Sequence, residues 1–416
     1  MRRRALLVSW LLVLPLAAAV LVAGADRPIT RVVAIGDVHG ALPELVAILQ
    51  RMNLVDAGRR WSGGRSTLVQ TGDLLDRGAH SRDVLDLAMA LEPQAKKAGG
   101  SFLPMLGNHE AMNAMGDLRY VTPAIYKTFA TARSESVRTE AFREYVAFMR
   151  AHAGHAHALA VPADEASRNT WMDEHPLGCF EYRDAMGPDG RYGRWIRRHP
   201  AAVQIADVVF VHGGLNPALP FDSVAAIDRQ VHAELDGFDR LWRELVRGGL
   251  VWRYMTLRQA VAFLGEEETW MQAQAAPKDA AAAERVRRLL TYRQWAIASS
   301  DGPLWYRGLV KEVDAPFLSA FGALLTRLGA RYVVVGHTVQ ETSKVTPWVG
   351  GRVIAIDTGM LPEEYHGRAS ALEIRDGRVT AHYADGTAEA LDAPVRTSRL
   401  RTDAGAGRGD SSAPWP

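Results

Sequence analysis

The side chains of this sequence that could carry out chemistry stand next to glycines, directly after short apolar runs. Five segments share the pattern: GDVHG (36–40), GDLLDRG (72–78), GNHE (107–110), HGG (212–214) and GHT (336–338). Glycine lets the backbone turn sharply and leaves room for an ion or a phosphate beside the main chain. The segments contain these side chains of metal-binding type: Asp37, His39, Asp73, Asn108, His212 and His337. Such a mixture of oxygen and imidazole ligands suits manganese, iron or zinc better than calcium or soft copper.

These ligands are numerous enough to hold two metal ions ~4 Å apart if one carboxylate bridges them. We take Asp73 as the bridge. Two such ions can clamp the attacking and leaving oxygens of an in-line phosphoryl displacement, and they lower the pKa of bound water. Any one segment alone would also fit a capped turn or a hydrogen-bonded core histidine. Because all five follow apolar runs in this order, the sequence favours a two-metal site.

The elements that must bring these segments together are predicted from the alternation of β-branched and helical patterns. Between the first three expected strands, the apolar residues recur at helical spacing. This gives a βαβαβ order, which predicts a parallel sheet with helices on its faces. The carboxyl ends of parallel strands form one crevice, so the segments are expected to converge there. An Asp376–Gly377 turn predicts a closing hairpin. The expected strands are 31–35, 66–71, 101–106, 207–211, 331–335, 352–356 and the hairpin 371–383.

The chain of 416 residues, 48% of them hydrophobic, is long enough for one large α/β domain or two smaller ones. We expect one catalytic domain over 26–392, because the largely helical stretches 111–200 and 216–330 fit insertions better than separate domains. Residues 393–416 lack hydrophobic periodicity and are expected to be disordered. A histidine-rich segment at 152–157 has no strand before it, so it is interpreted as a loop rather than a metal cluster.

Charge and cysteine content exclude several classes of protein. The 49 basic and 47 acidic residues leave a formal charge of +2, which offers no field for nucleic acid or an anionic membrane. Cys179 is the only cysteine of the chain, so an internal disulfide and a cysteine-based metal cluster are excluded.

The first 25 residues have the composition of a secretory signal. A basic MRRR start precedes an uncharged apolar stretch, and Ala23-Gly24-Ala25 forms a small-residue cleavage pattern before Asp26. The expectation is export, in a bacterium to the periplasm, with no stable membrane association once the signal is cleaved. The alternative is an uncleaved anchor over 5–24, which approaches the ~20 residues of a membrane-spanning helix.

The motif set GDVHG, GDLLDRG, GNHE, HGG and GHT resembles that of the calcineurin-like metallophosphoesterases. The Asp-Arg-Gly and Asn-His-Glu forms are similar to those of the phosphoprotein phosphatases, and within them to the Shewanella-like protein phosphatases. The resemblance covers about 30–385. It implies an α/β fold in which a β-sandwich is flanked by helices, and a metal-dependent phosphoric ester hydrolase with two metal ions.

The same resemblance implies a role for each matching residue. Asp37, His39 and Asp73 would bind one metal ion, and Asp73, Asn108, His212 and His337 the other. His109 matches the general acid, Asp76 the carboxylate that orients it, and Arg77 a phosphate-binding arginine. Arg307 in GPLWYRG is the candidate for a second phosphate-binding arginine. Two alternatives without a catalytic role stay open. His109 could be only a structural neighbour of the site, and Arg307 could be a salt-bridged surface residue.

Two departures from the family bear on the substrate. Leu106 stands where eukaryotic serine/threonine phosphatases commonly have arginine, and IDTGM (356–360) lies near the position of their Ser-Ala-Pro-Asn-Tyr loop. Both argue against serine/threonine specificity of the eukaryotic kind. The Shewanella-like resemblance favours a phosphorylated protein, with phosphotyrosine ahead of phosphoserine or phosphothreonine. A symmetrical diadenosine tetraphosphate hydrolase, another small-phosphoester hydrolase and a non-catalytic metal-binding protein remain alternatives.

Overall fold

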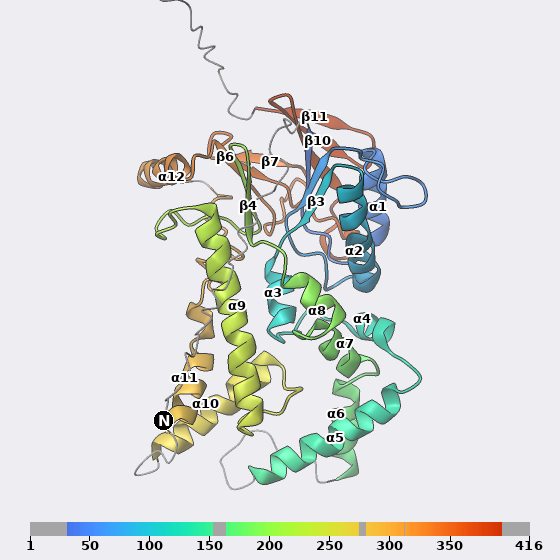
Figure 1. Ribbon diagram of the computed structural model, residues 1–416, viewed down its shortest axis with the longest axis vertical. Coiled ribbons are helices and arrows are strands. Elements are labelled where there is room, and N and C mark those ends of the chain that lie inside the picture. Colours follow the sequence, from blue (N-terminus) through green and yellow to red (C-terminus); the bar gives the residue numbers. More distant parts are fainter. Residues whose placement is uncertain (1–30, 153–163, 274–279, 312, 393–416) are drawn as a thin grey trace, which may run out of the picture.

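The computed structural model describes residues 31–152, 164–273, 280–311 and 313–392. The predicted signal, the predicted disordered tail and most of the histidine-rich segment lie outside these ranges. Figure 1 shows a strand-rich part at one end of the molecule and a helical part at the other.

The first sheet has six strands in the order β11-β10-β9-β1-β2-β3. Strands β1, β2 and β3 are parallel, and helices α1 and α2 connect them as the βαβαβ pattern predicted. The other strands are antiparallel, and the Asp376–Gly377 turn joins β9 to β10 with positive φ at both residues. The bounds are β1 Arg31–Ile35, α1 Leu42–Arg51, β2 Thr67–Gln70, α2 Ser81–Lys97, β3 Ser101–Pro104, β9 Ser370–Arg375, β10 Arg378–Tyr383 and β11 Ala388–Leu391.

The second sheet has five strands in the order β4-β5-β6-β8-β7. Its three central strands are parallel, and an antiparallel strand closes each edge. The bounds are β4 Ala202–Ile205, β5 Val208–Val211, β6 Tyr332–Val335, β7 Thr346–Trp348 and β8 Val353–Ala355.

The two sheets pack as a sandwich around a layer of buried aliphatic and aromatic side chains. Alternate residues of each central strand point into this layer, as the period of two of a strand requires. The opposite face of the second sheet packs against α12 (Ala315–Leu328), while α1 and α2 lie on the outer side of the first. Representative members of the inner layer are Val32, Ala34, Val69, Phe210, Val334 and Ile354. The predicted α/β sandwich flanked by helices is confirmed.

The helical part is built from the chain between β3 and β4 and between β5 and β6. Helix α3 lies where the strands meet this part, and the long helix α9 runs from the sheets into it (Figure 1). The first group is α3 Asn108–Ala114, α4 Pro123–Phe129, α5 Ser134–Ala151, α6 Glu165–Glu174, α7 Cys179–Met186 and α8 Arg191–Ile196. The second is α9 Val224–Arg247, α10 Leu257–Ala273, α11 Ala280–Leu290 and the short 3-10 helix Tyr292–Gln294, and α13 (Pro362–Tyr365) follows β8.

One expectation of the strand arrangement was wrong. The motif-bearing strands do not share one sheet, because β1 to β3 belong to the first sheet and β5 and β6 to the second. Strands β4, β7 and β11 were not predicted from the sequence. All three lie at sheet edges, and β7 is a three-residue strand with Pro347 at its centre, so neither length nor alternation marks them.

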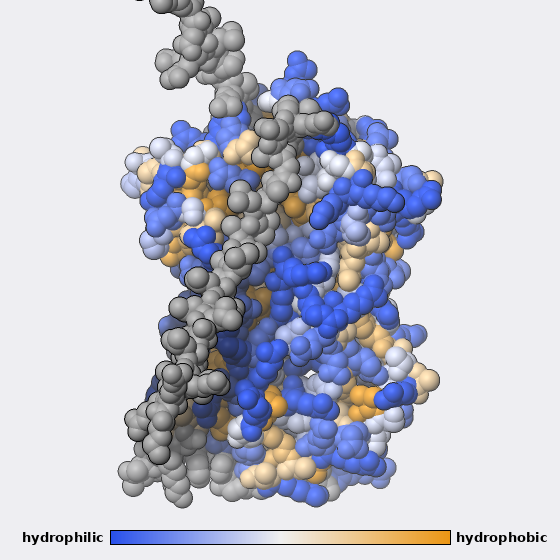
Figure 2. All heavy atoms as spheres, viewed as in Figure 1, coloured by the Kyte–Doolittle hydropathy of each residue, from blue (hydrophilic) through white to orange (hydrophobic). Residues whose placement is uncertain are grey.

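The surface carries no sign of a membrane-crossing helix in the described part of the chain: none of its helices is both long and apolar enough. Hydrophilic residues dominate the face shown in Figure 2, with hydrophobic residues in separate patches.

Candidate active site

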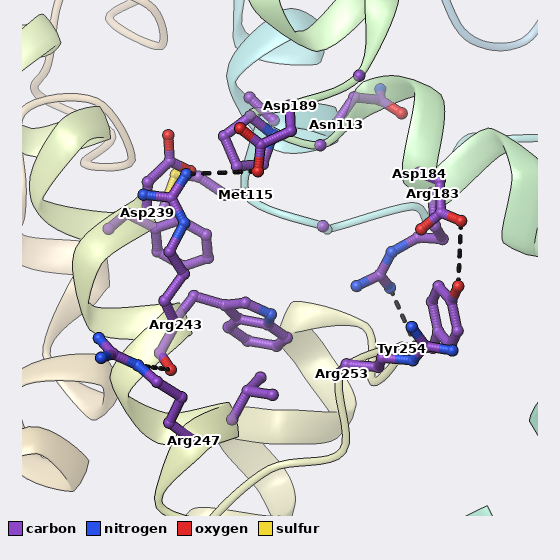
Figure 3. A pocket seen from close by; sticks show the side chains of 18 residues that line it. Asn113, Met115, Arg183, Asp184, Asp189, Asp239, Arg243, Arg247, Arg253 and Tyr254 are labelled. Carbon is purple, nitrogen blue, oxygen red and sulfur yellow. Dashed lines mark hydrogen bonds and ion pairs between the residues drawn. The ribbon is translucent and has the colours of Figure 1, made fainter. Parts of the chain in front are cut away.

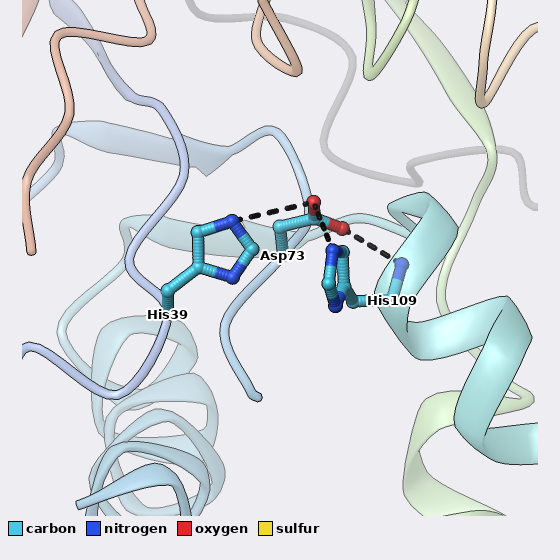
Figure 4. Close-up of side chains that lie close together, drawn as sticks. All are labelled: His39, Asp73 and His109. Carbon is cyan, nitrogen blue, oxygen red and sulfur yellow. Dashed lines mark hydrogen bonds and ion pairs between the residues drawn. The ribbon is translucent and has the colours of Figure 1, made fainter. Parts of the chain in front are cut away.

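The six predicted metal ligands all lie at the carboxyl ends of strands from both sheets, and each is buried. None of them is more than 6% exposed. Potential ligand atoms of His39, Asp73 and His109 lie within 4.8 Å of one another, and the same holds for Asp73, His212 and His337. Figure 4 shows Asp73 between His39 and His109. Two buried triads that share one carboxylate are consistent with a dinuclear metal site.

The imidazoles are oriented as metal ligands usually are. Nδ1 of His39 is 3.1 Å from the carbonyl oxygen of Leu75, and Nδ1 of His212 is 2.9 Å from that of Thr71. Each Nδ1–H can therefore donate to the main chain, which leaves the Nε2 lone pair for a metal. These Nε2 atoms lie 3.7 Å (His39) and 3.3 Å (His212) from Oδ2 of Asp73.

The remaining predicted ligands complete the donor set. Oδ1 of Asn108 is 2.8 Å from Nε2 of His212, and Oδ2 of Asp37 is 3.9 Å from Nε2 of His39. Nε2 of His337 is buried and has no hydrogen-bond partner among the described residues. A buried polar atom without a partner costs free energy, so this nitrogen fits a position next to a metal ion. The residues present thus suit two ions of manganese, iron or zinc type.

The pKa values of the predicted ligands shift in different directions. Burial would lower the pKa of His212, but Asp73 raises it above its usual value. Burial lowers the pKa of His39 to about 3 and that of His337 well below its usual value, so both imidazoles are neutral. Burial would raise the pKa of Asp73, but His212 and then His109 hold it well below the usual range. Burial and then the neighbouring Asp357 raise the pKa of Asp37.

The loops that carry these residues hold the backbone in an uncommon conformation. His39, Asp73, Asp76, Arg77 and His337 all have φ between 49° and 73°, in the left-handed region. This conformation costs a non-glycine residue conformational free energy, and residues that adopt it are frequent at functional sites. The sharp turns of these loops are therefore made by the predicted site residues themselves as well as by the neighbouring glycines.

Glu110 fastens the loop after β2 to the start of α3. Its carboxylate accepts hydrogen bonds from the backbone N–H groups of Asp73, Leu74 and Gly107 at 2.7–2.8 Å. At Gly107 an added Cβ would lie 2.1 Å from Oδ1 of Asp73, so only glycine fits there. Sequence reasoning quoted GNHE but gave Glu110 no role.

The predicted general acid is held by a chain of hydrogen bonds. Nδ1 of His109 is 2.6 Å from Oδ2 of Asp76, and Nδ2 of Asn113 donates to both oxygens of Asp76 at 3.0 and 2.9 Å. The hydroxyl of Tyr182 in turn donates to Oδ1 of Asn113 at 2.5 Å. Burial would lower the pKa of His109, but Asp73 and Asp76 raise it above its usual value. Asn113 is one turn after His109 on α3, which is the signal that could have revealed it.

The two candidate phosphate-binding arginines lie at the rim. The Arg77 guanidinium is 4.7 Å from the ring centroid of Tyr120, and its Nη1 is 2.7 Å from Oε1 of Glu364. Nη1 of Arg307 donates to the carbonyl oxygen of His337 at 2.7 Å. Within the described residues Arg307 forms no ion pair, so the salt-bridged alternative finds no support.

Asp357 is a buried acid of the site that sequence reasoning missed. Its Oδ1 accepts from the N–H of Gly359 at 3.0 Å, and burial raises its pKa to about 6. IDTGM follows the apolar strand β8 in the same way that the five motifs follow their strands. That shared pattern was the signal, but IDTGM was considered only as a replacement for a family loop.

Comparison with known proteins identifies the family. Residues 30–341 match the calcineurin-like phosphoesterases. The chain belongs to this family. Among curated relatives of this phosphoesterase, Shewanella-like protein phosphatase 2 of Arabidopsis thaliana is 27% identical over 355 residues, 83% of this chain and 75% of that protein. Shewanella-like protein phosphatase 1 of Plasmodium berghei is 22% identical over 359 residues, 84% and 73% of the two chains.

A solved structure has a similar fold. The cold-active protein-tyrosine phosphatase of a psychrophilic Shewanella species is 25% identical, with a TM-score of 0.50 over 88% of this phosphoesterase and 81% of that chain. The resemblance to the Shewanella-like branch, first drawn from the motifs, is therefore confirmed.

Proposed function

We propose that this protein is a dinuclear-metal phosphoesterase that hydrolyses phosphomonoesters on proteins, with phosphotyrosine as the preferred residue. The observation that carries the proposal is the pair of buried triads sharing Asp73, one of which contains His109, whose Nδ1 faces Asp76. The names of the relatives support a protein substrate. The metals are proposed to be manganese, iron or zinc ions.

In this proposal the metal ions, when bound, neutralise the charge of the phosphate and activate water. Nε2 of His109 gives a proton to the departing oxygen, while Asp76 accepts from Nδ1–H and fixes the ring. Arg77 and Arg307 bind phosphate oxygens, because guanidinium groups match them with two parallel hydrogen bonds. Arg77 must exchange Glu364 for the substrate to do so.

An aromatic rim supports the preference for phosphotyrosine. The Tyr120 ring lies 4.9 Å from that of His109, and Tyr365 lies 5.8 Å from His39. Tyr120 is 37% exposed, so its ring is open to a substrate. A flat aromatic leaving group packs against such rings better than the short alkyl chain of serine.

The test is a comparison of substrates on one metal-loaded preparation. A phosphotyrosine peptide, a phosphoserine peptide of the same sequence and diadenosine tetraphosphate are supplied side by side. We expect the highest kcat/KM for phosphotyrosine. Faster turnover of the dinucleotide would replace the protein phosphatase proposal with that of a dinucleotide hydrolase, and no turnover of any substrate would leave only metal binding.

A further inference from the structure

A second cavity opens on the other end of helix α3, away from the residue His109 that begins the helix. It has a volume of about 630 Å³. Its walls come from the end of α3 (113–116), from α7 and the loop after it (183–190), from α9 (238–247) and from the turn at 253–254. None of the proposed metal ligands lines it.

The charge of this cavity is unbalanced at Arg183. Its Nη1 and Nη2 donate to the carbonyl oxygens of Tyr254 and Met255, at 3.3 and 2.8 Å. Within the described residues Arg183 forms no ion pair with a carboxylate. Burial lowers the pKa of Arg183, as expected for a cation held away from water. Figure 3 shows the Arg183 side chain beside Tyr254, on the side of the cavity opposite the helix that carries Arg243 and Arg247.

The acidic residues of the lining are already engaged. Asp239 forms a two-pronged ion pair with Arg197 at 2.8 and 2.9 Å, and Asp184 accepts from the Tyr254 hydroxyl at 3.1 Å. The remaining acid, Asp189, is exposed and lies 3.8 Å from Arg243.

Other arginines of the lining differ in their partners. Arg253 is neutralised by Glu144 at 3.0 and 3.1 Å. Arg247 donates through Nε to the backbone carbonyl oxygen of Arg243. The positive charge of Arg183, Arg243 and Arg247 thus exceeds the negative charge that the acidic residues of the lining have left to neutralise it.

The rest of the lining is apolar and partly aromatic. Phe238, Trp242 and Val246 project from α9, and Tyr254 faces them from the turn. Cavities that combine an apolar lining with a few convergent polar groups are typical ligand sites. A cavity whose lining includes both cations and an indole ring suits a flat ligand that carries a negative group.

The cavity touches the support of the catalytic acid. Asn113 lines it and also donates to both oxygens of Asp76. Tyr182, which donates to Asn113, directly precedes Arg183 on α7. A ligand drawn to Arg183 would therefore act on the hydrogen-bond chain that ends at His109.

We propose that this cavity binds an organic anion, a carboxylate or phosphate group on a flat apolar body, and that its occupancy is transmitted through Tyr182 and Asn113 to Asp76. Arg183 holds the anionic group, Arg243 adds a second cation, and Trp242 contacts the flat body. The site is distinct from the dinuclear centre and does not depend on the substrate proposed above.

The test measures binding of 2-naphthoate by calorimetry to the metal-loaded protein without added phosphate, because inorganic phosphate could itself occupy the cavity. The neutral 2-naphthamide serves as the control for charge. Arg183→Gln and Arg243→Glu should each weaken 2-naphthoate binding at least about tenfold, since each loses a charged contact. Arg229→Glu, an exposed residue of α9 outside the lining, should bind like wild type.

A second readout tests the connection to Asp76. Saturating 2-naphthoate should change kcat for alkyl phosphates more than for 4-nitrophenyl phosphate, because only the former need the proton of His109. Absence of 2-naphthoate binding, equal binding of the amide, or unchanged affinity in Arg243→Glu would overturn the site. Tight binding without any effect on the alkyl phosphate rate would overturn the transmission.

Discussion

At the scale of single residues, the proposed roles in metal binding and in proton transfer follow the partner of each histidine. His39 and His212 turn Nδ1 to a main-chain carbonyl, whereas Nδ1 of His109 turns to the carboxylate of Asp76. A carbonyl that accepts from Nδ1–H leaves Nε2 to face a metal ion, which suits a ligand. A carboxylate favours the imidazolium, which suits a proton donor.

Replacing His109 by asparagine should slow alkyl phosphate hydrolysis by about 10²–10⁴-fold, because a basic alkoxide needs the proton. Hydrolysis of 4-nitrophenyl phosphate should fall far less, since its phenolate leaves unaided. The measurement is kcat/KM over a series of leaving groups at matched metal content. A constant loss across the series would make His109 a structural neighbour only.

Asn113→Ala should reproduce this trend in a milder form, with about tenfold slower alkyl phosphate hydrolysis, because Asp76 loses its amide donor. Tyr182→Phe removes only the outer hydrogen bond and should have a smaller effect in the same direction. The exposed Asn169→Ala is the matched control. Equal leaving-group dependence in wild type and Asn113→Ala would contradict the positioning role of Asn113.

At the scale of elements, the sequence analysis predicted those strands that are followed directly by polar, ligand-type residues. The motif-bearing strands β1, β2, β3, β5 and β6 were found because each belongs to a short apolar run with ligand-type residues next to it. The division of these strands between two sheets was missed, since strand pairing depends on contacts between segments far apart in sequence. Arg77 was expected at phosphate, and its contact with Glu364, 287 residues away, could not be foreseen.

The packing of β2 against the start of α3 can be tested at Gly107. Gly107→Ala places a methyl group against Oδ1 of Asp73 and should lower stability by about 1–3 kcal/mol. Thermal unfolding measures the loss. Gly265→Ala in α10 is the control, because its Cβ meets nothing within 4 Å and it should be neutral or stabilising. An unchanged melting temperature in Gly107→Ala would show that the loops are not tightly fixed.

At the scale of the whole molecule, the site depends on the packing of the two sheets. This packing brings together residues that are far apart in the sequence. Oδ1 of Asp37 accepts from the N–H of His337, 300 residues further along the chain, at 2.9 Å. The predicted ligands on the two sheets therefore come together only when the sheets pack. This coupling explains why each motif alone was weak and the ordered set was informative.

Export is a property of the whole chain that the sequence alone addresses. We expect the mature protein to begin near Asp26, because the Ala-x-Ala pattern ends at Ala25. Intact-mass spectrometry of the protein recovered from the periplasmic fraction checks this start. Recovery of the full-length chain with membranes would instead support an anchor over 5–24.

The measurement that tests the central claim most directly is the metal content per chain, determined by elemental analysis on wild type and on Asp73→Asn. Wild type should hold about two transition-metal ions per chain, and Asp73→Asn should hold fewer, because both ions lose their shared carboxylate charge. Turnover of the variant should be nearly abolished. A wild-type content of one ion or less, or two ions and normal turnover in Asp73→Asn, would contradict a dinuclear site bridged by Asp73.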